Sequence, residues 1–276
     1  MSQDIAIEHV SLGLLGPVPH TRTNAMTVHC LIIRHGSRVI LVDTGFGARE
    51  MENPNQLVGF DAIFKLGFMT DVRMTALERL TAQGIAPNDV TDIILTHLDN
   101  DHAGGLHDFP GAVVHVAAEE LESYESIQPR GPYKPYQISH LTKFKTYEPT
   151  GEKWFDLDAR SLVLPEDLQL KLIPLPGHTL GHCGVAYREN GTWALHAGDS
   201  YFDSTVNFIT DGPALPIEAA FQSDAQKRVE SLRKLQRLRQ EHRGEIDIFC
   251  THDEHEFLDR TRGRGRPDPV VDRLFL

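Results

Sequence analysis

The chain has 276 residues, 40% of them hydrophobic and 24% charged. That length allows one large domain or two small ones, and the composition is that of an ordinary globular protein. Lys and Arg total 27 against 39 Asp and Glu, which gives a net charge of −12 and disfavours a nucleic-acid-binding surface. No stretch approaches the roughly 18 consecutive apolar residues of a membrane span, and Met1–Val10 carries acidic residues where a signal peptide carries basic ones.

Two residue types stand out in the composition. The three cysteines, Cys30, Cys183 and Cys250, are too few and too scattered for a disulfide framework, and Cys183 and Cys250 lie in apolar segments typical of a core. The 15 histidines are unusually many, and several stand beside aspartates. We therefore expect a reduced, cytoplasmic protein that binds a small molecule and has neither a membrane nor a nucleic acid as its partner.

Short apolar segments alternate with amphipathic ones along the chain. Strands are expected at Ile5–Leu15, Val28–Arg34, Arg38–Val42, Asp92–Leu95, Ala112–Val116, Leu168–Leu172, Cys183–Arg188, Thr192–His196 and Ile246–Cys250. Helices are expected at Thr70–Gly84, Ala118–Ser126, Ser223–Arg243 and across the stripe Phe60, Phe64 and Phe68. That stripe fits the core, an acyl-chain pocket or a dimer contact, so a homodimer stays open. The pattern predicts one α/β domain over residues 1–276, with two sheets and helices outside them.

Residues 128–155 interrupt this alternation, because they mix four prolines with several aromatic residues. The segment is too irregular for a core element and too aromatic for a linker. We interpret it as an insertion that forms a lid over a cleft.

Four of the predicted strands are followed at once by His or Asp. Residues 96–102 read Thr-His-Leu-Asp-Asn-Asp-His, and the three later segments read Pro176-Gly177-His178-Thr179, His196-Ala197-Gly198-Asp199 and Thr251-His252-Asp253. Imidazole and carboxylate are the ligands that divalent zinc, iron or manganese take when thiolates are absent. Apolar strands can hold such loops rigidly around a shared cleft. The sequence therefore predicts a metal site.

These motifs, in this order, resemble those of the metallo-β-lactamase superfamily. The resemblance extends from Asp43 to His252, and the family's His-X-His-X-Asp-His motif reads His97-Leu-Asp99-Asn-Asp101-His102 here. It implies an αβ/βα four-layer sandwich with a dinuclear site at the sheet edge. The implied ligands are His97, Asp99 and His178 for one ion, Asp101, His102 and His252 for the other, and Asp199 as the bridge. Asp43 in Val-Asp-Thr-Gly resembles the carboxylate that orients a ligand imidazole in the family.

Asp99 departs from the family pattern, which has its second His at this position. Two divalent ions bring a charge of +4, while Asp99, Asp101, Asp199 and a bound hydroxide bring −4. The additional carboxylate favours harder ions and weakens their Lewis acidity. We therefore expect two divalent ions, with zinc as the first expectation and iron or manganese admitted by Asp99.

Among the branches of the superfamily, the chain resembles the N-acyl-homoserine lactonases and their relatives. The resemblance implies a hydrolase in which a hydroxide held by two ions opens an ester-type bond of a lactone, with Asp101 passing a proton to the leaving group. Tyr201, in Gly-Asp-Ser-Tyr, is a candidate for hydrogen-bonding the substrate carbonyl. Alternatives are a hydrolase of thioesters, phosphotriesters or aryl esters, a metal- or ligand-binding sensor without turnover, and a di-iron redox protein.

Overall fold

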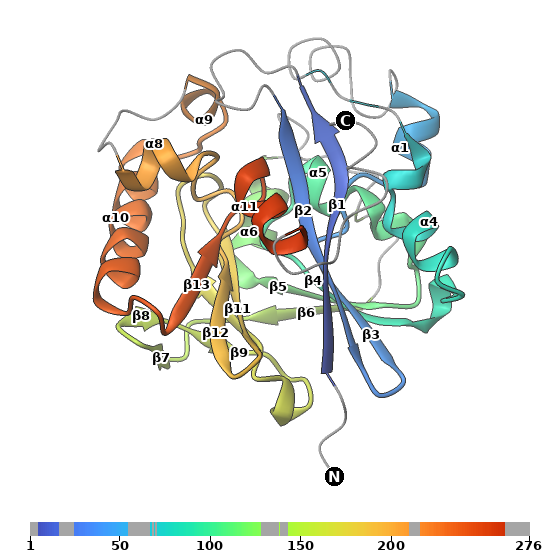
Figure 1. Cartoon of the computed structure of the whole chain (residues 1–276), viewed down its shortest axis with the longest axis horizontal. Coiled ribbons are helices and arrows are strands. Elements are labelled where there is room, and N and C mark those ends of the chain that lie inside the picture. Colours follow the sequence, from blue (N-terminus) through green and yellow to red (C-terminus); the bar gives the residue numbers. More distant parts are fainter. Residues whose placement is uncertain are drawn as a thin grey trace.

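The computed structural model describes residues 5–16, 25–54, 67, 69, 71–127, 138, 143–209 and 216–262. Two sheets form the centre of the molecule (Figure 1). The first sheet has six strands in the order β1 (Ile5–Leu15), β2 (Met26–His35), β3 (Arg38–Val42), β4 (Val90–Ile94), β5 (Val113–Ala117) and β6 (Phe144–Tyr147). The second has five, in the order β13 (Ile246–Phe249), β12 (Thr192–His196), β11 (Cys183–Glu189), β10 (Lys171–Pro174) and β9 (Arg160–Ser161).

Helices cover the outer faces of the two sheets. In Figure 1, α10 (Ala225–Glu241) lies outside the second sheet, whereas α1 (Ala48–Glu52) and α4 (Ala76–Thr81) lie outside the first. The other α-helices are α5 (Asn100–Ala103), α6 (Ala118–Ile127), α8 (Ser204–Ile209), α9 (Pro216–Ala220) and α11 (Glu254–Thr261). Short 3₁₀ turns are η1 (Val72–Met74), η2 (Pro87–Asp89), η3 (Gly104–Asp108) and η4 (Glu166–Leu168), and β7 (Lys153–Trp154) pairs with β8 (Leu157–Asp158). This is the four-layer α/β arrangement that the sequence predicts.

The inner strands are mostly apolar because both of their faces are buried. On β2, Cys30 and Ile32 belong to the core beneath the outer helices of the first sheet, whereas Leu31 and Ile33 belong to the core between the sheets. A third core lies between the second sheet and Leu235 and Leu238 of α10. Continuous apolar runs, rather than alternating ones, are the mark of such doubly covered strands.

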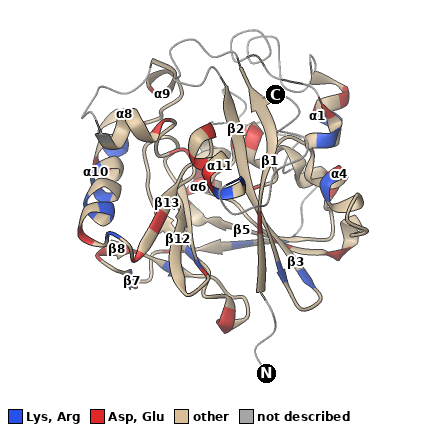
Figure 2. Ribbon diagram, in the orientation of Figure 1, with Lys and Arg blue, Asp and Glu red and all other residues tan. Residues whose placement is uncertain are grey.

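The surface charge is concentrated outside these strands. Figure 2 shows Lys and Arg along α10, while the strands of both sheets are mostly free of charged residues. Within the described residues, no helix is long and apolar enough to span a membrane. Cys30, Cys183 and Cys250 are buried free thiols, as the sequence predicts for the last two.

Three sequence-based predictions need correction or stay untested. The expected helix at Thr70–Gly84 is shorter, because Thr75 caps a new helix at Ala76 by accepting the Glu78 N–H. The expected insertion at 128–155 is not wholly separate, because Phe144–Tyr147 forms the edge strand β6 and pairs in parallel with β5. Residues 128–137 and 139–142, with the lid role, and Phe60, Phe64 and Phe68 lie outside the described residues.

Candidate metal centre

The predicted ligands meet at one edge of the two sheets, because the strands that precede them run in the same direction. β3 pairs in parallel with β4, and β12 pairs in parallel with β13. The carboxyl ends of parallel strands lie at the same edge. Asp43 and His97 therefore leave the first sheet beside each other, and Asp199 and His252 leave the second. The loop after β10 adds His178.

The side chains fall into two groups of possible ligands. The His97 subsite comprises His97, Asp99 and His178, and the His102 subsite comprises Asp101, His102 and His252; the ligand atoms within each group lie within 4.8 Å of one another. In the first, His178 Nε2 is 3.0 Å from Asp99 Oδ2. In the second, His252 Nε2 is 3.5 Å from Asp101 Oδ2. The structure thus brings together the two sets that the family resemblance implies.

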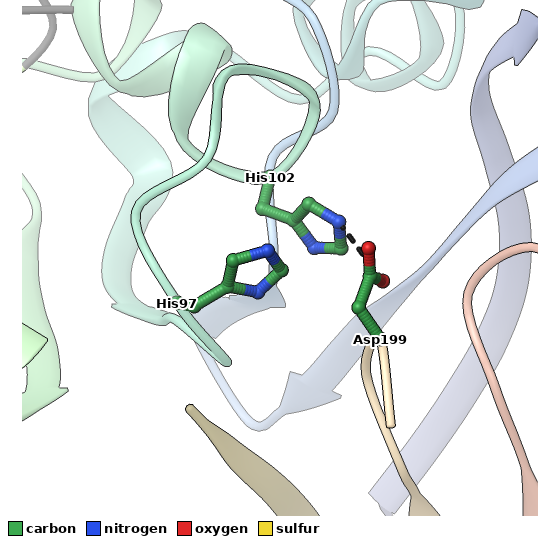
Figure 3. A group of neighbouring side chains, drawn as sticks. All are labelled: His97, His102 and Asp199. Carbon is green, nitrogen blue, oxygen red and sulfur yellow. Dashed lines mark ion pairs between the residues drawn. The ribbon is translucent and has the colours of Figure 1, made fainter. Parts of the chain in front are cut away.

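Asp199 lies between the two subsites. Its Oδ1 is 3.2 Å from His102 Nε2, and its Oδ2 is 3.0 Å from His252 Nε2 and 3.5 Å from His178 Nε2. Figure 3 shows His97 and His102 side by side, with Asp199 facing them from the second sheet. Both oxygens thus face the His102 subsite, and Oδ2 also faces His178 of the His97 subsite, so the carboxylate lies within reach of both groups.

A buried hydrogen-bond chain orients two of the imidazoles. Asp43 has a left-handed backbone (φ +57°), which aspartate tolerates better than most residues, and its Oδ1 accepts the Thr96 N–H at 2.8 Å. Its Oδ2 accepts the Thr96 hydroxyl at 2.8 Å and His102 Nδ1 at 2.9 Å. The same hydroxyl is 3.0 Å from His97 Nδ1. Both rings are thereby held with Nε2 toward the cluster, as the family resemblance implies for Asp43 and His102.

His252 is oriented in the same way by the first sheet. Its Nδ1 donates to the Thr27 carbonyl at 2.8 Å, which leaves Nε2 toward the cluster. Within the described part of the chain, four buried atoms of the cluster have no hydrogen-bond partner: His97 Nε2, His102 Nε2, Asp99 Oδ1 and Asp199 Oδ1, of which His102 Nε2 and Asp199 Oδ1 face each other as an ion pair at 3.2 Å. Burying polar atoms without partners is costly. Because the four are imidazole nitrogens and carboxylate oxygens, they fit divalent cations.

The electrostatics of the cluster also favour positive charge. Burial tends to raise the pKa of Asp99 and Asp199, yet the surrounding histidines hold both pKa values below the usual range. Burial tends to lower the pKa of His102, but Asp199, Asp101 and Asp43 raise it well above its usual value. A metal ion must therefore compete with protons at these imidazoles.

The candidate ligands differ in the exposure of their side chains to solvent. The side chain of Asp101 is 19% exposed, whereas those of the other six candidate ligands are at most 8% exposed. The Phe202 ring packs 4.6 Å from the His252 ring and 6.0 Å from the His178 ring, measured between centroids. Asp101 is therefore the most exposed of the candidate ligands, and Phe202 is an apolar side chain packed against two of the histidines.

Tyr201 does not face this cluster. Its side chain has no exposed surface, its hydroxyl donates to Glu256, and it packs in the core beneath α10. The predicted contact with a substrate carbonyl is therefore not available in this structure. The chain turns over residues 197–200, where the Ser200 N–H donates to the Ala197 carbonyl, so Asp199 faces the cluster while Tyr201 enters the core.

Two further histidines, His182 and His196, have supporting positions beside the cluster. His182 Nδ1 donates to the Leu175 carbonyl, and its Nε2 accepts the Asp199 N–H at 2.9 Å. Burial lowers the pKa of His182 well below its usual value, which agrees with a neutral imidazole that donates at one nitrogen and accepts at the other. His196 bonds the His29 carbonyl and the Gly198 N–H.

Sequence reasoning missed Glu120, which is fully buried next to the cluster. Its carboxylate accepts the Leu98 N–H at 2.9 Å and the Thr179 hydroxyl at 2.6 Å. An acidic residue in the first turn of a helix is common, so the sequence carries no signal for this role.

The fold and the cluster define a metal-binding α/β sandwich, and a family model agrees. The model of the metallo-beta-lactamase superfamily matches residues 23–242. The chain belongs to this superfamily.

Known relatives include metallo-hydrolases and lactonases. The chain is 33% identical over 181 residues to a "probable metallo-hydrolase" of Mycobacterium tuberculosis, an alignment that covers 64% of this chain and 58% of the relative. It thus spans less than two thirds of that relative's length. It is 29% identical to the N-acyl homoserine lactonase of Bacillus cereus over 75% of this chain and 76% of that one. A Bacillus thuringiensis AiiA mutant with N-decanoyl-L-homoserine at its active site superposes with a TM-score of 0.69 at 22% identity, covering 93% and 96% of the chains.

Proposed function

We propose that the chain is a metal-dependent hydrolase that opens a lactone. The observation that carries this proposal is the convergence of the two ligand triads on Asp199, with four buried ligand atoms that lack hydrogen-bond partners in the described structure. Likeness to the lactonases of Bacillus supports the substrate class. The proposed ligands are His97, Asp99, Asp101, His102, His178, Asp199 and His252.

Two divalent ions bound there would supply a hydroxide at neutral pH and stabilise the developing oxyanion. The protein's own side chains would do the rest. Asp43 and Thr96 keep the imidazoles of His97 and His102 in the ligating orientation. Asp101, the most exposed carboxylate of the cluster, is placed to take up a proton and deliver it to the leaving alcohol. Phe202 limits water on one side of the substrate.

Asp99 bears on the choice of metal. The His97 subsite has one carboxylate of its own, and Asp199 lies within 3.5 Å of its His178. Three carboxylates and a hydroxide balance two divalent ions, whereas a histidine at position 99 would leave a charge of +1. Carboxylates suit manganese and iron better than imidazoles do, so we propose that this subsite accepts those ions as well as zinc.

Metal analysis of protein purified without added metal, followed by a substrate panel with that metal, tests the proposal. We expect two ions per chain and hydrolysis of N-acyl-homoserine lactones or γ-lactones. His97→Ala and Asp199→Ala should lose metal and activity together. Retention of both ions by these variants would contradict the ligand assignment.

The substrate panel separates the remaining candidates. Turnover of thioesters, phosphotriesters or aryl esters without lactones would change the substrate class. Metal and ligand binding without any hydrolysis would indicate a sensor. Oxygen consumption by iron-loaded protein would indicate redox chemistry.

A further inference from the structure

Glu120 connects the two loops that supply the His97 subsite. It lies at the start of α6, and its side chain is 0% exposed. Oε1 accepts the N–H of Leu98, the residue between His97 and Asp99, at 2.9 Å. Oε2 accepts the Thr179 hydroxyl at 2.6 Å and the Gly181 N–H at 3.2 Å.

The close packing of these loops shows that the connection is built into the fold. A Cβ at Gly181 would lie 2.1 Å from the backbone nitrogen of Glu120, so only glycine allows the His178 loop to approach this far. The adjacent Glu119 bonds neither loop and instead forms two hydrogen bonds of 2.6–2.7 Å with Arg160. The start of α6 therefore lies directly against the His178 loop, and Glu120 is the residue whose carboxylate reaches both loops.

A different buried carboxylate thus lies next to each subsite. Asp43 bonds directly to the ring of His102 in the His102 subsite and reaches His97 only through the Thr96 hydroxyl. Glu120 bonds to backbone and hydroxyl groups beside His97, Asp99 and His178, the three members of the His97 subsite. A carboxylate accepts hydrogen bonds on both of its oxygens, whereas a side-chain amide accepts on its oxygen and donates from its nitrogen.

We propose that Glu120 is a positioning residue that sets the metal affinity of the His97 subsite independently of the His102 subsite, an inference that rests on the proposed metal centre. Loss of its carboxylate would let the Leu98 and Thr179–Gly181 segments separate and spread the three ligands. Substitutions of such outer-shell partners cost about 10- to 100-fold in metal affinity. The structure places that loss in one subsite only.

Stepwise titration with Co²⁺, against a chelator and followed by absorption spectra, tests this proposal. In Glu120→Gln we expect one of the two binding steps to weaken about 10- to 100-fold, while the other step keeps its affinity. Asp43→Asn should weaken the opposite step most, because Asp43 bonds the His102 ring directly and reaches His97 only through the Thr96 hydroxyl. Thr179→Val, which removes one partner of Glu120, should weaken the same step as Glu120→Gln.

Glu119→Gln is the matched control, because it removes the neighbouring carboxylate, whose partner is Arg160 rather than the ligand loops. We expect both Co²⁺ steps to stay unchanged in this variant. Equal weakening of both steps in Glu120→Gln, or an unchanged titration, would overturn the proposal, because a general loss of stability does not discriminate between subsites.

Amide hydrogen exchange in metal-free protein separates this proposal from the proposed function. Exchange at Leu98 or at Gly181 should be faster in Glu120→Gln than in Glu119→Gln, since the amide keeps one acceptor oxygen and leaves one of these two N–H groups without its acceptor. If the wild-type protein bound no Co²⁺, both the metal centre and its tuning by Glu120 would be refuted. If Co²⁺ bound but exchange and both steps were the same in Glu120→Gln, only the role of Glu120 would be refuted.

Discussion

Replacing Asp43 with asparagine changes the group that orients His102 and leaves all seven proposed ligands in place. Asp43 accepts three hydrogen bonds, of 2.8, 2.8 and 2.9 Å, through both oxygens. In Asp43→Asn one oxygen remains for the Thr96 N–H, and the amide nitrogen faces His102 Nδ1. An amide N–H donates to that nitrogen and so favours the tautomer that carries its proton on Nε2, which cannot bind a metal ion.

The expected magnitude follows from that change of tautomer. Outer-shell substitutions of this kind lower metal affinity about 10- to 100-fold, which corresponds to about 1.4–2.7 kcal/mol. At a fixed saturating metal concentration, the stabilisation that metal gives to the folded protein falls by the same amount. The free energy of unfolding, measured with and without metal, should therefore show a smaller metal-dependent increment in Asp43→Asn than in the wild type.

Asp92→Asn provides the matched control. Asp92 also forms a buried pair with a histidine, His115, at 3.0 Å, but this pair lies on β4 and β5 and includes none of the proposed ligands. Asp92→Asn should lower the stability of the metal-free protein and leave the metal-dependent increment intact. If both variants keep the wild-type increment, or lose it equally, the orientation of His102 by Asp43 does not govern metal binding.

Three further predictions concern charge, pH and packing. Asp99→His should keep two ions, shift the metal preference towards zinc and lower the pH midpoint of the rate; an unchanged profile and preference would refute the charge argument. Burial and Asp253 raise the pKa of Glu256 to about 8 from 4.5, so between these pH values the folded protein holds a proton that the unfolded chain has released. As the pH rises through this range, the free energy of unfolding should therefore fall by up to about 1.4 kcal/mol per pH unit. Urea titrations across this range check that slope, which Glu256→Gln should flatten. Gly181→Ala should destabilise the protein by about 1–3 kcal/mol through overpacking, whereas Gly111→Ala, with open space around its Cβ position, should change the stability by less than about 0.5 kcal/mol in the same titration.

The ligand-bearing loops could be predicted from the sequence because each motif is local. A short apolar run followed at once by His or Asp marks both the strand and the residue at its end, as in Ile93-Ile94-Leu95 before His97. The apolar runs are long because cores cover both faces of the sheets, so most of the expected strands are confirmed with small shifts in their bounds. The strand expected at Leu168–Leu172 is an exception, because a 3₁₀ turn ends at Leu168 and β10 begins only at Lys171. What the local pattern does not contain is the partner of each strand.

β6 illustrates that missing information. Phe144–Tyr147 lies in a segment rich in proline and aromatic residues, so the sequence pattern does not predict a strand there. Its place in the sheet depends on pairing with β5, and the Tyr147 hydroxyl bonds His115 of β5 at 2.7 Å. A contact over 32 residues cannot be read from the composition of either segment.

Tyr201 and Glu120 show the same limit within the site. The sequence places Tyr201 two residues from Asp199, but the turn between them sends one side chain to the cluster and the other to Glu256. Glu120 is 22 residues from Leu98 and 59 from Thr179, yet it bonds both. Proximity in sequence predicts ligands on one loop, whereas the groups that hold the loops together come from tertiary structure.

The residues that hold the ligands in place, Asp43, Thr27 and Glu120, matter because burying the charged side chains of the cluster costs free energy. Asp99 and Asp199 keep low pKa values despite their burial, so their negative charge must be balanced within the cluster. Protons on the imidazoles can supply that balance, and so can divalent ions. Divalent ions would in addition coordinate the buried atoms of His97 and Asp99 that have no hydrogen-bond partner in the described structure. Asp43, Thr27 and Glu120 hold the surrounding loops in place, so we expect metal removal to destabilise this edge of the fold.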